Sequence, residues 1–374
     1  MNTFRKTLWI LCAIVTLLFP PFSVFCNVQD ISVTDAAGRP ALNYSEKALL
    51  KGETVKLKLK NAKGTVTFSS KNKKTASVSS SGQVTAKAAG TTVIIASCQG
   101  KSYRCRITVR DTVDLIVFAG QSNMTGRGDS TNVPKLADGA GYESRTVTNA
   151  GSLFALKEPF GMGQDRNSLN DNGLRTGSMV TSFVQAYYQR TQTPVVAVSA
   201  TIAGSGCVSW STIHYKEVAA RVRQAQKALK KRGLKIENCY LVFMQGENDG
   251  FAGTSQTFYK KRITQMFRNL QKSCSVEKCL LIRIGSYTKD PNLYADIVKA
   301  QTDLCQNNKN FVLVSVKAAS LKSSYYQEDG IHLTQKGLNV LGKEAGTNAA
   351  TYKLTGKEPN LKDSKYKNTY KPKR

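Results

Sequence analysis

The sequence VDLIVFAGQSNMTGRG, Val113 to Gly128, passes from an apolar run into a polar turn. The run Leu115 to Phe118 is typical of a buried β-strand, and it stops at Gly120. Ser122 follows two residues later, at the carboxyl end of the expected strand, where open α/β sheets bind ligands. A helix beginning there would place Ser122 near unpaired N–H groups that favour an oxyanion. Because a serine in this place is most often only a helix cap, a nucleophile needs support from elsewhere.

Two later motifs supply the partners that a nucleophilic serine requires. GEND (residues 246–249) directly follows a second apolar run, and DGIH (residues 329–332) lies near the end of the globular region. His332 has a carboxylate, Asp329, three residues before it. A serine hydrolase needs an imidazole base and a group that orients the imidazole. We therefore predict that Ser122, His332 and Asp329 form a catalytic triad.

The three motifs together resemble those of the SGNH (GDSL-type) hydrolase superfamily. GQSNM at residues 120–124 and QGE at residues 245–247 are similar to its sialate O-acetylesterase and acetylxylan esterase branch. The resemblance covers roughly residues 113–350, within a hydrolase domain that we assign to residues 113–354. It implies a flavodoxin-like three-layer α/β/α fold and an esterase that releases acetyl groups from carbohydrates through an acyl-enzyme. It implies no metal and no organic cofactor.

The resemblance also implies an oxyanion hole with three donors. These are the backbone N–H of Ser122, a glycine N–H and the side chain of Asn248. Gly204 stands at the better spacing from Trp210 to supply the glycine N–H, and Gly206 is the alternative. Esterases of this branch usually have two adjacent glycines here, whereas this chain has an alanine before Gly204.

Other polar and aromatic residues near the motifs are candidates to contact substrate. They are Gln121, Asn123, Gln245, Glu247 and Trp210. Asn123 and Gln245 could instead brace the loops. Arg127, Arg175 and Trp210 are candidates for the rim of the acyl pocket or for binding the carboxylate of an acidic sugar, whereas His214 is expected to pack or to line the mouth of the cleft. Glu247 and Asp249 could also suggest a paired-carboxylate glycosidase, but that interpretation leaves Ser122 without a role.

Apolar runs alternate with helical patterns through the rest of this region. Strand patterns occur at residues 194–200, 239–244, 279–284 and 311–316, and helical patterns at 216–231, 256–271, 293–305 and 334–345. Such alternation predicts a parallel sheet covered on both faces, here with five strands. After Thr355 the lysine-rich tail, residues 355–374, has almost no aliphatic residues. We expect this tail to be disordered and able to bind a polyanion.

Residues 1–26 have the features of a secretory signal peptide. Arg5 and Lys6 precede an uncharged apolar run at residues 8–19, which is too short to span a bilayer comfortably. We therefore expect a protein that is secreted or associated with the cell surface. A lipoprotein anchored at Cys26 is the less favoured alternative, because the residues before Cys26 are bulky.

Residues 28–110 have an all-β pattern of alternating runs and turns that predicts a small sandwich. The stretch from Thr67 to Thr91 resembles bacterial immunoglobulin-like domains of the invasin and intimin type. This part has no histidine, few acidic residues and no catalytic pattern. The resemblance implies a spacer or a surface-adhesion module.

The chain has 374 residues and a formal net charge of +29, with an isoelectric point of about 9.8. Lysines are spread along the chain without interleaved aromatics or a nucleic-acid motif, which argues against nucleic-acid binding. For an exported protein, such a charge favours anionic wall polymers, acidic glycans or anionic lipid headgroups as partners, or it serves solubility alone. The oligomeric state is left open.

Of the nine cysteines, seven follow residue 27, and an odd number leaves at least one thiol unpaired. Cys98 and Cys105 flank a turn, so a bridge between them is the best single prediction, whereas Cys274 and Cys279 could pair or remain free. No cysteine pair lies near a histidine with zinc-ligand spacing. Two other functions stay open for the whole chain: a glycan-binding adhesin with an inactive hydrolase domain, and a lipase-like esterase.

Overall fold

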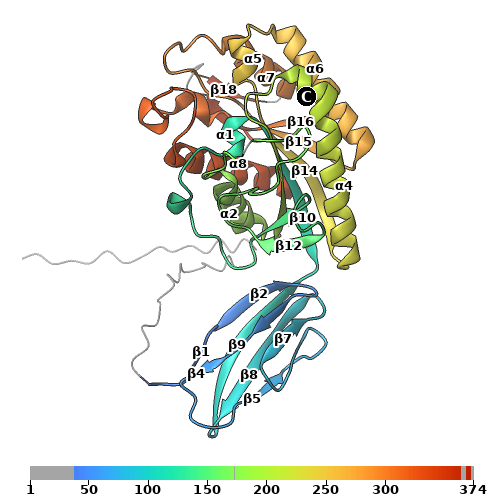
Figure 1. Ribbon diagram of the computed structural model, residues 1–374, viewed down its shortest axis with the longest axis vertical. Helices are drawn as coiled ribbons and strands as arrows, with labels where there is room; N and C mark the ends of the chain where they lie inside the picture. Colours follow the sequence, from blue (N-terminus) through green and yellow to red (C-terminus); the bar gives the residue numbers. More distant parts are fainter. Residues whose placement is uncertain (1–37, 172, 364–367, 372–374) are drawn as a thin grey trace, which may run out of the picture.

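The computed structural model describes residues 38–171, 173–363 and 368–371 (Figure 1). The predicted signal peptide, with the Cys26 anchor as its alternative, lies outside the described residues. No helix among those ranges is long and apolar enough to cross a membrane.

The amino-terminal part is a β-sandwich, as its alternating pattern predicts. Along β8 every second residue is buried, so one face of each sheet encloses a small apolar core. One sheet has the strand order β2 (Glu46–Leu50), β9 (Lys101–Arg110), β8 (Gly90–Cys98), β5 (Thr67–Ser70), and the other β3 (Thr54–Lys56), β7 (Gln83–Ala86), β6 (Ala76–Val78). Two short strands, β1 (Ala41–Leu42) and β4 (Leu59–Lys60), pair beside them.

The predicted bridge between Cys98 and Cys105 is wrong. On the β8–β9 ladder Cys98 is opposite Lys101, while Cys105 is opposite Ile94. Four positions along a strand amount to about 13 Å, which is far beyond the reach of a disulfide. Both cysteines are buried free thiols, as are Cys274 and Cys279, and all seven cysteines in the described part of the chain are buried.

The carboxyl-terminal part is built on a seven-stranded sheet. Its strands are parallel except for β12, which is antiparallel to β11 at one edge. In spatial order they are β12 (Ser152–Ala155), β11 (Gly141–Arg145), β13 (Val195–Thr201), β10 (Thr112–Gly120), β14 (Lys235–Met244), β15 (Lys278–Ile282) and β16 (Phe311–Ser315).

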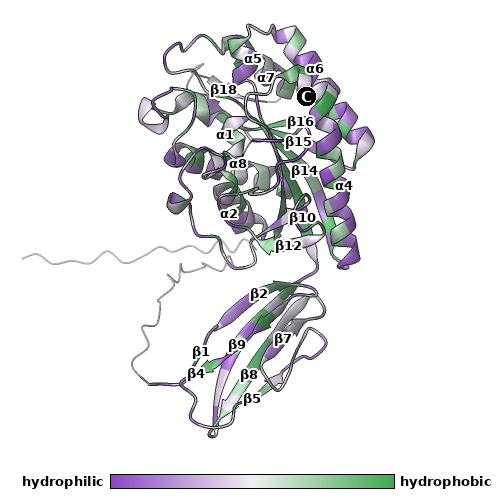
Figure 2. Cartoon of the chain, viewed as in Figure 1, coloured by the Kyte–Doolittle hydropathy of each residue, from purple (hydrophilic) through white to green (hydrophobic). Residues whose placement is uncertain are grey.

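Helices cover both faces of this sheet, which confirms the predicted three-layer α/β/α fold (Figure 1). On one side α2 (Val180–Thr191) packs on α8 (Gln335–Thr355), and on the other α4 (Tyr215–Lys231) packs on α6 (Gln256–Ser273), which contacts α7 (Ala295–Asn307). The strands between the layers are hydrophobic along their length, whereas the helices are polar on their outer faces (Figure 2). The shorter helices are α1 (Ser122–Thr125), η1 (Ser130–Asn132), α3 (Cys207–Ser209), η2 (Trp210–His214), α5 (Glu247–Phe251), η3 (Lys317–Ser320) and η4 (Ser323–Tyr325).

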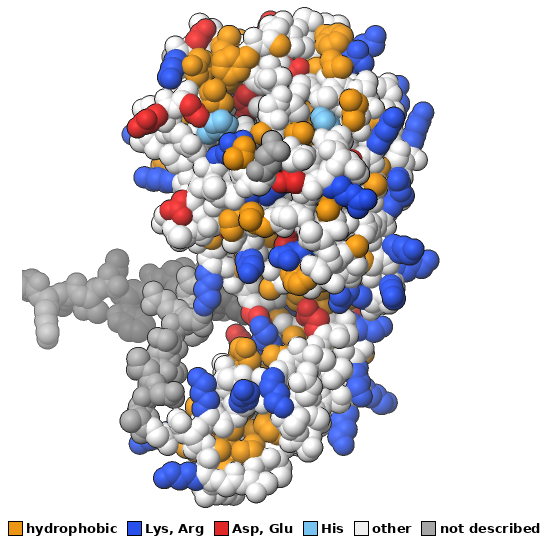
Figure 3. All heavy atoms as spheres, viewed as in Figure 1, with side chains coloured by type: hydrophobic (Ala, Val, Ile, Leu, Met, Phe, Trp, Pro, Cys, Tyr) orange, Lys and Arg blue, Asp and Glu red, His pale blue; other side chains and the backbone are white. Residues whose placement is uncertain are grey.

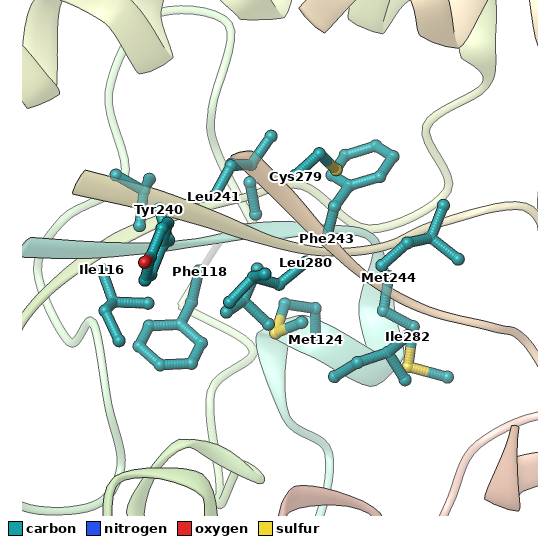
Figure 4. Packing of buried hydrophobic residues seen from close by; sticks show 14 of the residues in the cluster. Ile116, Phe118, Met124, Tyr240, Leu241, Phe243, Met244, Cys279, Leu280 and Ile282 are labelled. Atoms are coloured by element: carbon teal, nitrogen blue, oxygen red, sulfur yellow. The ribbon is translucent and has the colours of Figure 1, made fainter. Parts of the chain in front are cut away.

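The centre of the sheet is tightly packed. Side chains of β10, β14 and β15 interleave around Phe118 and Phe243, with Met124 of α1 among them (Figure 4). Phe118 is fully buried and makes edge-to-face contacts with Phe160 and Phe183. Burying one such side chain stabilises the fold by about 1.5–3 kcal/mol. The strand ends therefore form a rigid base for the loops that follow them.

The prediction of a disordered tail after Thr355 is wrong for the described residues. There β17 (Leu361–Asp363) pairs with β18 (Asn368–Tyr370). Leu361 and Tyr370 are buried, and Asp363 accepts a 2.5 Å hydrogen bond from the buried guanidinium of Arg283. Because a buried charge needs a partner, the ion pair with Arg283 holds this hairpin against the domain. The lysine-rich composition of the tail gave no sign of this contact.

Candidate active site

The three predicted motifs meet where the strand order of the sheet reverses. The chain leaves β10, pairs β13 on one side of it, and then crosses to pair β14 on the other side. In open α/β sheets such a switch point leaves a crevice beyond the carboxyl ends of the strands. The loops after Gly120, Thr201 and Met244 leave β10, β13 and β14 side by side at this crevice.

Gly120 makes the sharp turn that presents Ser122. Its φ of +141° is a conformation that side chains rarely adopt, and a Cβ there would overlap the carbonyl oxygen of Met244. Helix α1 begins at Ser122. The N–H of a first helical residue has no acceptor within its helix, so the N–H of Ser122 is available to a ligand.

His332 and Asp329 are in direct contact. Nδ1 of His332 lies 2.5 Å from Oδ2 of Asp329, and Oδ1 of Asp329 accepts the backbone N–H groups of Ile331 and His332 at 2.8 and 2.9 Å. Burial opposes ionisation, but hydrogen bonds from His332 and Ile331 outweigh it and lower the pKa of Asp329. The carboxylate is therefore charged at neutral pH and can fix the orientation of the ring.

Ser122 and His332 line one cleft of about 230 Å³. Ser122 is 5% exposed, at the base of the cleft, while the His332 side chain is 22% exposed. Among the described residues no hydrogen bond joins the serine hydroxyl to the ring. Such bonds are commonly long before substrate binds. The remaining lining residues are Gln121, Arg127, Ala203, Gly204, Glu247, Asn248, Phe251 and Ile331.

The structure favours Gly204 over Gly206 as the glycine that faces the cleft. Gly204 lines the cleft, and a Cβ on it would meet nothing within 4 Å. Gly206 instead precedes α3 and packs against the side chains of Asn248 and Asp249. Asn248 itself is exposed and lines the cleft. The three predicted oxyanion donors thus lie around one space.

Gln121 and Gln245 form a buried network that joins the loops after β10 and β14. Oε1 of Gln121 accepts the backbone N–H groups of Gly246 and Asn248 at 3.1 and 3.4 Å. Nε2 of Gln245 donates to Oε1 of Gln121, to the carbonyl of Ser205 and to Asp249. Gln245 has no exposed surface. Gln245 therefore braces the loops, and the prediction that it contacts substrate is wrong.

Asn123 connects the serine loop to the histidine loop. Its Nδ2 donates to Oε1 of Glu247 at 2.8 Å and to the carbonyl of Ile331 at 3.1 Å, and its Oδ1 accepts the N–H of Leu333 at 2.9 Å. Asn123 is 4% exposed and does not line the cleft, so it is a brace and not a substrate contact. Glu247 does line the cleft, and burial raises the pKa of its carboxyl group, an effect that Asn123 and His332 partly offset.

The predicted place of Trp210 in the site is also wrong. Trp210 is fully buried, donates its indole N–H to Ser205 Oγ at 2.8 Å, and packs edge to face on Phe243 and His214. His214 packs as expected, and burial lowers its pKa. Asp249 is turned away from the cleft, where it accepts the N–H of Cys207. Glu247 and Asp249 therefore do not form the facing pair of carboxyl groups that a glycosidase requires.

Two residues that the motifs did not reveal contribute to the site. Phe251, 47% exposed, lines the cleft and packs on Tyr287 and Tyr294. Asp171 is buried beneath the loop of Gly204. Arg127 lines the cleft, whereas Arg175 is buried and ion-paired to Asp171. Within the described ranges, no group of three or more histidine, cysteine or acidic side chains could hold a metal ion.

Comparisons with known proteins place this site in context. A family model described as carbohydrate esterase, sialic acid-specific acetylesterase, matches residues 112–351, and one for bacterial Ig-like domains (group 2) matches residues 40–103. A search of curated proteins finds no match. Among solved structures, a protein from Arabidopsis thaliana is 19% identical with a TM-score of 0.50, covering 65% of this chain and 98% of its own.

Two further solved structures are similar at lower scores. A carbohydrate acetylesterase from Xanthomonas citri is 14% identical with a TM-score of 0.45, over 87% of this chain and 77% of its own. NanS is 13% identical with a TM-score of 0.47, over 66% of this chain and 99% of its own. At these identities the Arabidopsis match shows a shared fold and nothing finer.

Proposed function

Because the chain belongs to the carbohydrate esterase family of sialic acid-specific acetylesterases, we propose that it hydrolyses acetyl esters of glycans through a serine nucleophile. One observation carries this proposal. Ser122, His332, Gly204 and Asn248, which come from four separate loops, line a single cleft. An imidazole oriented by a carboxylate, a hydroxyl and several N–H donors in one cleft is the arrangement that acyl transfer requires.

In the first half-reaction, Oγ of Ser122 attacks the acetyl carbonyl carbon while Nε2 of His332 takes the hydroxyl proton. Asp329, held 2.5 Å from Nδ1, stabilises the imidazolium. The N–H groups of Ser122 and Gly204 and the amide of Asn248 stabilise the tetrahedral oxyanion, with one such donor contributing about 3 kcal/mol. His332 then returns the proton to the sugar oxygen as the ester bond breaks.

In the second half-reaction, water attacks the acetyl-serine. His332 takes a proton from this water and returns a proton to Oγ of Ser122, and acetate leaves. The cleft of about 230 Å³ is small, which suits an acetyl group better than a long acyl chain. Arg127 on its wall offers a cation for the carboxylate of an acidic sugar, so sialic acids and uronic acids are our preferred substrates.

The direct test is acetate release from acetylated sialic acid, acetylated xylan and acetylated peptidoglycan. We expect wild type to release acetate from at least one of these, and Ser122→Ala to lower the rate by 10³-fold or more. Equal, near-zero release by both proteins would favour an adhesin with an inactive domain. A preference for long-chain p-nitrophenyl esters over acetate would favour the lipase-like alternative.

We also propose that the protein is exported, on the evidence of residues 1–26. Amino-terminal sequencing of the protein from the medium and the cell envelope tests this, and a retained Met1 would contradict it.

Lys and Arg side chains are spread over both parts of the molecule on the face in Figure 3. We propose anionic wall polymers or acidic glycans as their partners. We expect an immobilised polymer of this kind to retain the protein at low salt and to release it at high salt. If the polymer did not retain the protein, the positive charge would serve solubility alone.

A further inference from the structure

Asp171 is a buried carboxylate that no sequence motif contains. Its side chain is fully buried. Oδ2 accepts hydrogen bonds from Oγ1 of Thr125 at 2.9 Å and Oγ1 of Thr201 at 3.0 Å, and it lies 3.0 Å from Nη2 of Arg175. Oδ1 accepts the backbone N–H of Ala203 in a short hydrogen bond. One carboxylate thus has four polar partners, which matches its roughly four lone-pair sites.

Three of these donors belong to the two segments that supply the backbone donors of the proposed oxyanion hole. Thr125 is the last residue of α1, whose first residue is Ser122. Thr201 ends β13, and Ala203 directly precedes Gly204. Asp171 is therefore a bridge between the helix that carries Ser122 and the loop that carries Gly204.

The loop has other restraints on both sides of Gly204: the carbonyl of Ile202 accepts a hydrogen bond from Oγ of Ser205, and the carbonyl of Ser205 accepts one from Nε2 of Gln245. Ile202 donates its N–H to the carbonyl of Gly120, whereas Gly204 has a φ of +65° and free space around its α-carbon. Glycine is the residue with the least conformational restriction. The hydrogen bond from Ala203 to Asp171 is the backbone restraint directly before Gly204, which lines the cleft.

Arg175 makes this bridge stable. Its guanidinium lies 3.0 Å from Asp171, donates to Oγ1 of Thr201 at 2.8 Å, and binds Asp165 at 2.9 Å. A buried carboxylate without such a cation would be strongly disfavoured. Asp165 shares the arginine with Asp171 and accepts the backbone N–H of Asp171. It makes none of the contacts of Asp171 with α1 or the Ala203 loop, and its side chain is 17% exposed; an asparagine at position 165 keeps an acceptor for that N–H.

We propose that Asp171 is a positioning residue that sets the spacing between the N–H groups of Ser122 and Gly204. This inference rests on the proposed esterase function. It differs from a purely structural role, because loss of the bridge should weaken binding of the transition state more than binding of the substrate.

The test compares Asp171→Asn with the matched control Asp165→Asn in the full chain. Asparagine keeps the shape of the aspartate side chain. In the variant, however, its NH₂ group faces donors that face a carboxylate oxygen in the wild type. We expect Asp171→Asn to lower kcat for p-nitrophenyl acetate by about 10²-fold, the loss associated with one oxyanion donor, with KM changed less than threefold. A tetrahedral phosphonate inhibitor should lose reactivity in parallel, and Asp165→Asn should stay within threefold of wild type in each measurement.

A second variant and a second measurement keep the outcome clear. Thr125→Val removes one of the four contacts, so we expect a smaller loss of about threefold to tenfold in kcat. Hydrogen exchange at the Ala203 and Gly204 amides should accelerate in Asp171→Asn and not in Asp165→Asn. Equal kinetics and equal exchange in the two aspartate variants would overturn the inference. Absence of esterase activity in wild type would instead refute the proposed function, and the exchange measurement would still decide whether Asp171 holds the loop.

Discussion

Replacement of Asn123 by alanine tests whether a buried amide holds the histidine loop in place. The substitution removes two donated hydrogen bonds, to Glu247 and to the carbonyl of Ile331, and one accepted from the N–H of Leu333. A hydrogen bond of this kind contributes about 1 kcal/mol, and a buried group left without its partner costs more. We therefore expect the free energy of unfolding to fall by about 3 kcal/mol, some loss being offset by water that enters the space.

The effect on catalysis follows from the positions of the lost bonds. Ile331 and Leu333 flank His332, so Asn123 fixes the backbone on both sides of the proposed base. A general base contributes only when it lies within hydrogen-bonding reach of the proton that it removes. We expect kcat for acetyl esters to fall at least tenfold in Asn123→Ala.

Asn348→Ala is the control, because Nδ2 of Asn348 donates to the carbonyl of Val314 at 2.9 Å, in α8 and away from the cleft. Urea unfolding should show a loss of about 1 kcal/mol in this control, with kcat unchanged at a temperature where all proteins are folded. If Asn123→Ala lost stability but kept a kcat within twofold of the control, the amide would support the fold alone, and our account of the histidine loop would be refuted.

Three other changes have expected outcomes. Gly120→Ala should lower the free energy of unfolding by more than about 3 kcal/mol, because strain at φ +141° adds to the overlap with Met244. Gly253→Ala, at φ +62° in open space, should lower it by about 1 kcal/mol, and urea unfolding measures both. Burial raises the pKa of Glu247, so the native state keeps this proton to a higher pH than the unfolded state does. The native state therefore loses stability as the pH rises above about 4.5. Relative to wild type, the free energy of unfolding of Glu247→Gln should increase from pH 4 to 7, as measured by urea unfolding at each pH. Phe251→Ala should raise KM more for an acetylated oligosaccharide than for p-nitrophenyl acetate, because the exposed ring offers a face to a sugar.

The sequence predicted the sheet well where strands are apolar throughout. The runs at residues 194–200, 279–284 and 311–316 correspond to β13, β15 and β16 within two residues at each end, because strands buried on both faces must be continuously hydrophobic. The strands β11 and β12 and the helix α2 were not predicted. β12 is a short, partly exposed edge strand, and β11, although mostly buried, has the sequence GYESR, so the composition of both strands differs little from that of a loop.

The motifs also predicted which loops meet, but not which way each side chain turns. Ser122, His332, Gly204 and Asn248 all line the cleft, because the carboxyl ends of neighbouring parallel strands share one edge of the sheet. Gln245 and Trp210 come from the same loops and point into the protein. Chain position alone could not reveal this, since a side chain's direction depends on backbone angles that no short motif specifies.

The loops of the site have a common construction. Their backbone polar groups are held by buried polar side chains more than by apolar packing: Gln121 accepts the N–H of Gly246, Asn123 binds both sides of His332, and Asp171 accepts the N–H of Ala203. Such bonds are directional, so they fix the orientation of a loop more sharply than apolar contact does. The hydrogen bonds named here act on residues near Asn248, His332 and Gly204, so they do not occupy the side chains of Asn248 and His332 or the N–H of Gly204. A rigid sheet can thus present a cleft whose reactive groups are fixed in place while their own hydrogen-bonding capacity stays available to substrate.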